Sequence, residues 1–164
     1  MKYMILCVFT TLLMAYGTQQ TPSPTNIVPL MGNGMENEAV RQVLAEEIRD
    51  VMTITNSRFI DVLYYKYDLN SNGRLDIITY IQSPLHCGSR GCSFWIWIND
   101  GSGEYMHSGS LTVNLLTFEG EVHPKVRVAI SAHKTNGFFD IEISGPYVSG
   151  VLRYYMGRYL WLPI

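Results

Sequence analysis

The segment from residue 68 to residue 76 holds the residues best suited to bind a cation. Its pattern is D-x-N-x-N-G-x-x-D. Carboxylate and amide oxygens are the ligands that Ca²⁺ takes, and a glycine in such a loop permits a sharp turn. The backbone carbonyl of Arg74 would add a further oxygen. The predicted metal ligands are the side chains of Asp68, Asn70, Asn72 and Asp76. Because only two of these four side chains are charged, the predicted calcium site is weak.

This loop differs from an EF-hand. An EF-hand needs a glutamate at the twelfth position, which here is Thr79, and a helix on each side, whereas strand-like sequence flanks this loop. The alternative is that the Asp and Asn side chains bond only to the backbone of their own turn. Both interpretations remain open from the sequence. Calcium is the only cofactor suggested, and none is required.

Residues 1–17 have the features of an export signal. Lys2 supplies a positive charge, residues 3–14 are apolar, and Ala15-Tyr16-Gly17 is a small-x-small cleavage site. The apolar run is shorter than the roughly 20 residues that a membrane-spanning helix needs. We therefore predict a periplasmic protein that has no membrane contact after cleavage of the signal.

The sequence contains three cysteines, and the predicted export decides which of them can pair. Cleavage removes Cys7 and leaves Cys87 and Cys92 in the turn C-G-S-R-G-C. A single pair in an oxidising compartment predicts a disulfide, and the glycines next to both cysteines let the backbone bend back. The alternative is a zinc site that includes His86. Structural zinc usually takes four ligands in paired spacings, and the sequence has no second cysteine pair.

The same turn is the strongest candidate for a contact with another protein. A short loop closed by a disulfide loses little entropy on docking. Arg90 at its tip can form a forked bond to a carboxylate or carbonyl, with Ser89 and His86 beside it. The predicted binding residues are therefore His86, Ser89 and Arg90. The alternative is that the turn only joins two strands.

Catalytic patterns are missing from the sequence. It contains no G-x-S-x-G elbow and no H-E-x-x-H pair, and its four histidines are scattered singly. A thiol nucleophile at Cys87 conflicts with the predicted disulfide. We therefore assign no catalytic residue and predict that the protein is not an enzyme.

Length and composition limit the number of domains and the classes of molecule that the protein can bind. The 164 residues, 47% of them hydrophobic, are enough for one domain with a core. A formal net charge of −2, with 16% charged residues, gives no basic surface for nucleic acid or anionic lipid. Neither is an expected partner.

Hydrophobic periodicity predicts one helix followed by strands. Apolar residues at three- and four-residue spacing predict an amphipathic helix over Glu36–Met52, capped by Asn33 or Asn37. Runs of β-branched and aromatic residues, separated by Gly- and Asn-containing turns, predict strands further on. The predicted strands are Arg58–Tyr67, Leu75–Gln82, Ser93–Ile98, Ser110–Phe118, Lys125–Ala132, Phe138–Ser144, Val151–Tyr155 and Tyr159–Leu162.

Strands this close along the chain pair most simply with their neighbours, antiparallel. The predicted fold class is therefore α+β: an antiparallel β-meander sheet with one N-terminal amphipathic helix packed on it. We divide the chain into a signal peptide (residues 1–17), a flexible leader (18–35) and a single α+β domain (36–164).

The chain resembles a family of small exported bacterial proteins in four consecutive features. These are the D-x-N-x-N-G-x-x-D loop, the strand after it, the C-G-S-R-G-C turn and the next apolar strand. In that family a D-L-N-G-D-G-type loop precedes a C-G-x-G-G-C turn and a β-rich tail, and no activity is assigned. The resemblance runs from Tyr64 to the C-terminus, with Asn72 for the usual Asp and Arg90 for a small residue. In format alone, the chain is similar to periplasmic immunity and inhibitor proteins. Some of these block peptidoglycan amidases delivered by type VI secretion.

That similarity implies an exported, non-enzymatic inhibitor or immunity protein that occludes a cell-wall (peptidoglycan) hydrolase in the periplasm. The alternative is a calcium-stabilised envelope or structural module, and a small hydrolase is the third hypothesis. The expected partner is a protein, and formation of a homodimer is also left open.

Overall fold

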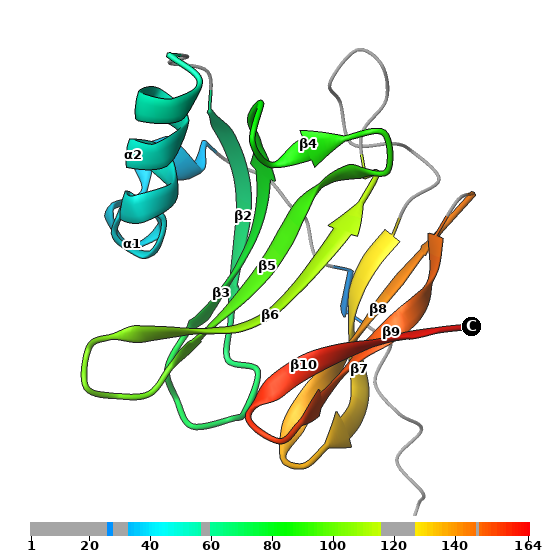
Figure 1. Ribbon diagram of the computed structural model, residues 1–164. Coiled ribbons are helices and arrows are strands. Elements are labelled where there is room, and N and C mark those ends of the chain that lie inside the picture. Colours follow the sequence, from blue (N-terminus) through cyan, green and yellow to red (C-terminus); the bar gives the residue numbers. More distant parts are fainter. Residues whose placement is uncertain (1–25, 28–32, 57–59, 116–126, 147) are drawn as a thin grey trace, which may run out of the picture.

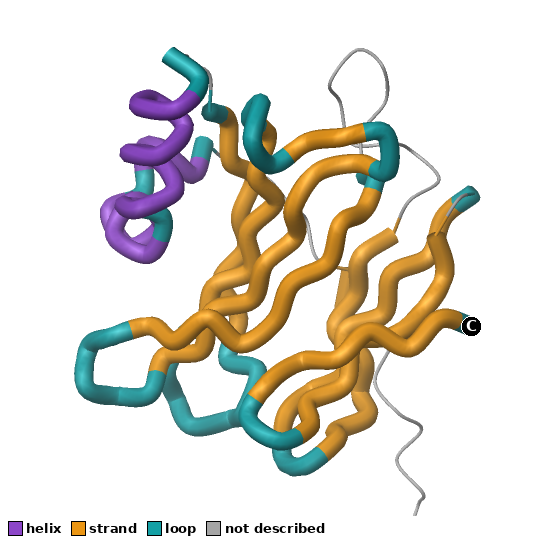
Figure 2. The backbone as a smooth tube through the Cα atoms, viewed as in Figure 1, coloured by secondary structure: helices purple, strands orange, loops and turns teal. Residues whose placement is uncertain are grey.

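A computed structural model describes residues 26–27, 33–56, 60–115, 127–146 and 148–164 of the chain. Two short α-helices and mainly antiparallel strands make up this part of the chain. The strands lie in two facing sheets, and the helices lie against the outer face of one sheet (Figure 1 and Figure 2). The predicted signal peptide, residues 1–17, lies outside the described residues.

The first sheet carries the predicted calcium loop and the disulfide turn. Its strands run in the order β2–β3–β5, and β4 and β6 both pair with β5. Their bounds are β2 Asp61–Tyr67, β3 Asp76–Gln82, β4 Cys87–Gly88, β5 Gly91–Asn99 and β6 Tyr105–Val113.

The second sheet has the order β1–β7–β8–β9–β10. Its strands are β1 Asn26–Ile27, β7 Arg127–Thr135, β8 Phe138–Gly145, β9 Val148–Tyr155 and β10 Arg158–Pro163. Each predicted strand overlaps one strand of the structure, and the mainly antiparallel β character is confirmed. The strands form two sheets, however, and not the single meander sheet that the sequence suggested.

Parts of the predicted leader, residues 18–35, belong to regular structure. Strand β1 pairs with Ala129 and Ile130 of β7. A 3₁₀ turn spans Gly34–Glu36 and is capped by Asn33, whose side-chain oxygen accepts the backbone N–H of Met35 at 3.1 Å. The other residues of the leader lie outside the described ranges.

The predicted helix Glu36–Met52 is divided into α1 (Glu38–Val43) and α2 (Ala45–Ile54). The division falls at Leu44, whose backbone has φ −104° and ψ 13°. Asn37 caps α1, since its side-chain oxygen accepts the backbone N–H of Val40 at 3.3 Å. Leu44 is fully buried, so the bend is fixed around a core side chain. Neither described helix is long and apolar enough to cross a membrane.

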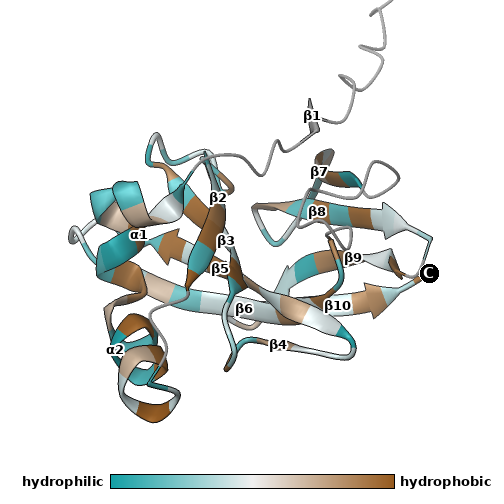
Figure 3. Ribbon diagram, turned by 90° about the horizontal axis from the view of Figure 1, so that it is seen from above, coloured by the Kyte–Doolittle hydropathy of each residue, from teal (hydrophilic) through white to brown (hydrophobic). Residues whose placement is uncertain are grey.

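Strand β3 is the centre of the core because both of its faces are covered. Its first six residues are all buried. Successive side chains of a strand point to opposite faces. Ile78 and Tyr80 therefore belong to the cluster between the two sheets, while Ile77 and Ile81 belong to the cluster under the helices. Figure 3 shows these three layers from above, with the helices and the second sheet on opposite sides of the first sheet.

The two sheets approach most closely where β6 runs beside β10. A Cβ atom built on Gly109 would lie 2.7 Å from the Cβ of Tyr159, so only glycine fits at this position without movement. The Tyr159 ring is buried, and its hydroxyl donates to the backbone carbonyl of Phe139 at 2.9 Å. Burial strongly raises the pKa of Tyr159 above its usual value. The hydroxyl thus stays protonated and links β10 to β8.

Asp76, predicted as a metal ligand, is a buried acceptor that joins three segments. One carboxylate oxygen accepts the N–H of Leu69 at 2.8 Å, and the other accepts the N–H of Asn99 at 2.9 Å. Leu69 also receives the N–H of Phe139, from the second sheet, on its carbonyl at 2.7 Å. Burial raises the pKa of Asp76, while the two backbone N–H groups act in the opposite direction. The carboxylate therefore fixes the start of β3 against the end of β5.

We expect Asp76→Asn to lower the free energy of unfolding by about 1–3 kcal/mol, because an amide can accept at only one of the two positions and leaves a buried N–H without an acceptor. Denaturant unfolding followed by circular dichroism measures this loss. Asp100→Asn is the matched control, since that exposed carboxylate bonds to Ser102 within its own turn. An equal shift of the unfolding midpoint in both variants would contradict the assignment.

Candidate functional site

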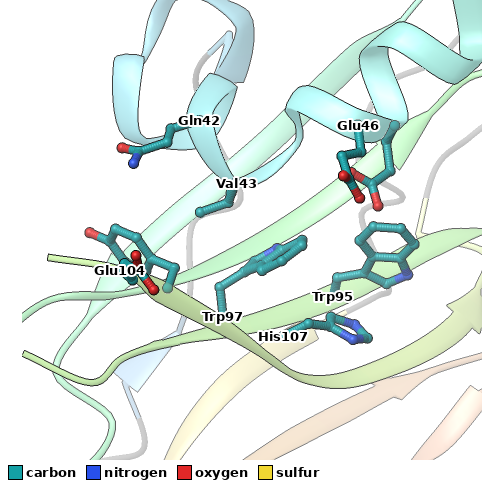
Figure 4. Close-up of a pocket in the computed structure, with 9 residues that line it drawn as sticks. Gln42, Val43, Glu46, Trp95, Trp97, Glu104 and His107 are labelled. Atoms are coloured by element: carbon teal, nitrogen blue, oxygen red, sulfur yellow. The ribbon is translucent and has the colours of Figure 1, made fainter. Parts of the chain in front are cut away.

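A groove lies between the helices and the edge of the first sheet. It encloses about 500 Å³. Helices α1 and α2 supply one wall, strands β5 and β6 supply the floor, and the turn before β6 closes one end (Figure 4). We call it the aromatic groove. The residues that line it are Gln42, Val43, Glu46, Glu47, Trp95, Trp97, Glu104, Tyr105 and His107.

The floor of the aromatic groove is a cluster of rings. Trp95 and Trp97 are two residues apart on β5 and therefore share a face of the sheet. Their ring centroids are 5.7 Å apart in an edge-to-face arrangement. The His107 ring lies 5.2 Å from Trp95 and 5.1 Å from Trp97. This pairing depends on a bulge, because the register between β5 and β6 shifts between Ile96 and Trp97.

The rings differ in exposure. Trp97 is buried, and its indole N–H donates to the hydroxyl of Thr79 at 3.2 Å, so its position is fixed. Trp95 is half-buried, and His107 is exposed. The helices cover the β2 and β3 side of this face and leave the β5 and β6 side partly open. An aromatic surface with a rigid base is therefore accessible from solvent.

Carboxylates line the aromatic groove at both ends. Glu46 and Glu47 lie in the first turn of α2, and Glu104 lies in the turn between β5 and β6. Figure 4 shows Glu46 above the Trp95 ring and Glu104 at the other end, beyond Trp97. Among the described residues that line the groove there is no lysine or arginine. The groove is thus aromatic at its floor and negative around it.

His86, predicted as a binding residue, lies beside the aromatic groove. Its ring contacts Trp95 edge-to-face with centroids 5.3 Å apart, and its Nδ1 is 2.7 Å from the hydroxyl oxygen of Ser83. Burial lowers the pKa of His86, and the nearby Glu47 carboxylate partly opposes that effect. His86 supports the Trp95 ring from the side of the disulfide turn.

The predicted disulfide between Cys87 and Cys92 is confirmed, with Cα atoms 4.0 Å apart. It closes a hairpin in which β4 pairs with β5 and two residues form the tip. Gly91 has φ 112°, and a Cβ there would lie 2.2 Å from the backbone of Val113. Glycine is therefore required both by the backbone conformation and by the close approach of β6. Both sulfurs are used in the disulfide, which excludes them as zinc ligands in this state.

The structure separates the three predicted binding residues. Ser89 and Arg90 form the hairpin tip and line a second hollow of about 360 Å³ with Val113 of β6 and Val148 of β9. His86 does not line this hollow and faces Trp95. The tip and the aromatic groove therefore lie at different places on the described surface.

The predicted calcium loop uses its side-chain oxygens within its own turn. Asp68 accepts the N–H groups of Asn72 and Gly73, at 3.0 and 2.7 Å. Asn70 and Asn72 accept backbone N–H groups two residues further on, at 3.0 and 2.8 Å. Asp76 faces away, toward the buried N–H groups described above. Among the described residues, no three His, Cys, Asp or Glu side chains are grouped as metal ligands.

A second polar cluster lies on the second sheet. The buried carboxylate of Asp140 accepts from Nδ1 of His133 at 2.9 Å and from Nε of Arg153 at 3.3 Å, while its other oxygen has no hydrogen-bond partner among the described residues. A carboxylate that orients a histidine is one part of a catalytic triad. The hydroxyl of Ser131 contacts the backbone N–H of His133, at 3.3 Å. These contacts supply an oriented histidine but no activated nucleophile.

The aromatic groove is not evident from the sequence. The W-I-W repeat in β5 does place Trp95 and Trp97 on one face, but the sequence does not indicate which half of that face the helices cover. In the sequence, Glu46 and Glu47 fall on the polar side of the predicted helix, which gives no sign of a groove. The sequence therefore contains the residues of the groove, but only the tertiary packing of the helices on the sheet shows that they lie together.

Comparisons of this chain with protein-family models, with curated proteins and with solved structures give no match. The function is therefore inferred from the residues and geometry of the chain itself.

We expect acidification to destabilise the folded protein in part through His86. Because burial lowers its pKa below the ordinary 6.5, the unfolded chain takes up this proton at a higher pH than the folded chain does. The free energy of unfolding should therefore fall as the pH drops from 6.5 through the folded pKa. Thermal melts of wild type and His86→Gln, between about pH 8 and about pH 5, isolate this contribution.

The wild type should lose more stability over that range than His86→Gln does. His107→Gln is the control, because the side chain of His107 is exposed. Parallel pH profiles for wild type and His86→Gln would contradict the inferred role of burial.

Calcium binding by the loop stays a prediction. If the loop binds Ca²⁺, millimolar Ca²⁺ should raise the melting temperature by mass action, and Asp68→Ala should abolish the rise. Asp100→Ala is the control, because that carboxylate belongs to the neighbouring turn. Identical melting curves in Ca²⁺ and in EDTA would leave the loop with only its turn-forming role.

Proposed function

We propose that this chain is a non-enzymatic binding protein that recognises and occludes a protein partner through the aromatic groove. The observation that carries the proposal is the ring cluster on the floor of a concave surface, in which buried Trp97 supports the accessible rings of Trp95 and His107. Tryptophan is enriched among the residues that dominate binding energy at interfaces, particularly in pockets at their centre. A groove of this kind suits a side chain inserted by a partner.

Rigidity supports the same function. The indoles are held on a central strand, and the hydrogen bond from Trp97 to Thr79 fixes one of them before any partner arrives. Contacts that are already ordered lose less entropy on binding. The disulfide hairpin offers a second ordered element, with Ser89 and Arg90 at its tip.

We propose that the partner is a peptidoglycan hydrolase in the periplasm, so that the protein acts as an inhibitor or immunity protein. Support for export comes from the signal-like residues 1–17, and the disulfide fits an oxidising compartment. The proposed class of partner, a cell-wall hydrolase, comes from the similarity to periplasmic inhibitors, which are also small, β-rich and disulfide-bonded.

A calcium-stabilised envelope module is the second candidate. It is favoured by the D-x-N-x-N-G-x-x-D pattern, which groups the oxygen-bearing side chains of Asp68, Asn70 and Asn72 in one turn. Such a module would be retained on peptidoglycan or on a lipoprotein, and would not inhibit a hydrolase.

The test begins with co-purification from periplasmic extract and continues with the purified pair. We expect the co-purified hydrolase to be inhibited by the wild-type protein. Trp95→Ala should weaken the complex by about 2 kcal/mol or more, and Arg90→Ala by about 1–3 kcal/mol, the range of hot-spot truncations. Calorimetric titration measures the affinities, and thermal melts of each variant show whether folding is intact.

Tyr155→Ala is the matched control, because Tyr155 is a 51% exposed aromatic residue on the second sheet. It should bind like wild type. A folded Trp95→Ala variant with wild-type affinity would overturn the groove as the recognition site. Retention on peptidoglycan without inhibition of any hydrolase would favour the envelope module.

A further inference from the structure

We infer that the aromatic groove binds a cationic side chain, a lysine or an arginine presented by the partner protein. This inference rests on the proposed function and specifies the chemistry of its ligand. Four features of the aromatic groove lead to it: the rings of the floor, the carboxylates of the wall and the end, the lack of positive charge among the described lining residues, and the shape.

The rings provide the first feature. A cation is attracted to the face of an aromatic ring within about 6 Å, and tryptophan is the best such ring. Trp95 has His86, Trp97 and His107 around it on the sheet, and its remaining side faces the aromatic groove below α2. The methylene groups of a long basic side chain can pack along these indoles while its charged end stays outside the apolar surface.

The carboxylates provide the second feature. Glu46 and Glu47 are placed at the start of α2, where the helix dipole favours negative side chains. The dipole accounts for these two without any ligand, but it does not account for Glu104, which lies in a turn at the other end of the aromatic groove. Three carboxylates from two separate elements therefore converge on one aromatic floor.

Little positive charge balances these carboxylates. Glu46 contacts Arg49 at 3.8 Å, with both side chains largely exposed, and such surface pairs contribute little. Neither Glu47 nor Glu104 forms an ion pair with a described lysine or arginine. A basic side chain from a partner would supply the missing charge.

Shape distinguishes this ligand from the alternatives. The groove has a volume of about 500 Å³ and is partly open to solvent, so an extended side chain can enter from the partner. A neutral sugar or an apolar side chain would stack on the same rings but would leave the surrounding carboxylates without a partner. An acidic ligand would be repelled.

The experiment measures tryptophan fluorescence during titration with short peptides. Trp161 is the third tryptophan of the chain and lies on β10, so Trp161→Phe serves as the parent protein and leaves only the two indoles of the groove. The probes are tetra-arginine, tetra-lysine, tetra-serine, tetra-glutamate and the neutral sugar tetra-N-acetylchitotetraose. We expect the two basic peptides to change the emission, with affinities that fall as salt is added.

The matched variants separate local from overall charge. Replacing Glu46, Glu47 and Glu104 together by glutamine should weaken the basic peptides roughly tenfold, since charge-assisted contacts to the cation are lost. Replacing Glu36, Glu38 and Glu142 by glutamine removes the same net charge from exposed positions outside the groove and should change the affinity little. Equal losses in both triple variants would overturn the inference.

Two further results would overturn it while leaving the proposed function intact. One is a preference for the neutral sugar over the basic peptides. The other is a partner complex that Trp95→Ala weakens but the Glu46, Glu47 and Glu104 triple variant does not. If basic peptides bind the groove but Trp95→Ala leaves the affinity for the partner unchanged, then the groove binds cations and the proposal that it recognises the partner is wrong.

Discussion

The buried carboxylate of Asp76 is the interaction on which the arrangement of the first sheet depends. Its two oxygens accept N–H groups from Leu69 and Asn99, so one side chain fixes both the loop before β3 and the end of β5. Leu69 also receives a hydrogen bond from Phe139 of the second sheet. A buried charge is unfavourable unless it is bonded in this way. The hydrogen bond from Asn99 to the Asp76 carboxylate thus holds the C-terminal end of β5, the strand that carries Trp95 and Trp97.

The groove follows from incomplete coverage of a sheet. Strand β3 needs cover on both faces, and the second sheet and the helices provide it. The helical segment is short and bends at Leu44, so it covers the outer face over β2 and β3 but only partly over β5 and β6. The uncovered part of the face is aromatic. A packing shortfall in the scaffold therefore produces the surface that we propose to be functional.

Local sequence patterns predicted the features that depend on residues close together in the sequence, namely the disulfide and the strands. The disulfide was predicted because Cys87 and Cys92 are the one pair left after the predicted signal, and the strands were predicted from β-branched and aromatic runs between turns. Asp76 shows the limit, because the D-x-N-x-N-G-x-x-D pattern does not reveal that its last carboxylate turns inward to distant N–H groups. The proximity of His107 to the tryptophans depends on a bulge that no sequence rule placed. The separation of the strands into two sheets likewise depends on contacts between residues far apart in sequence.

The pairing order of the strands also bears on how the chain folds. Within the described residues, β2, β3, β5 and β6 each pair with the next of these strands, and the same holds for β7 to β10; only the two-residue β1 pairs with a strand far along the chain. Chains whose pairings are local close small loops and fold faster than β proteins with long-range pairings. Each sheet can therefore assemble hairpin by hairpin. Docking of the two sheets, with Gly109 against Tyr159, then brings together strands that are far apart in the sequence.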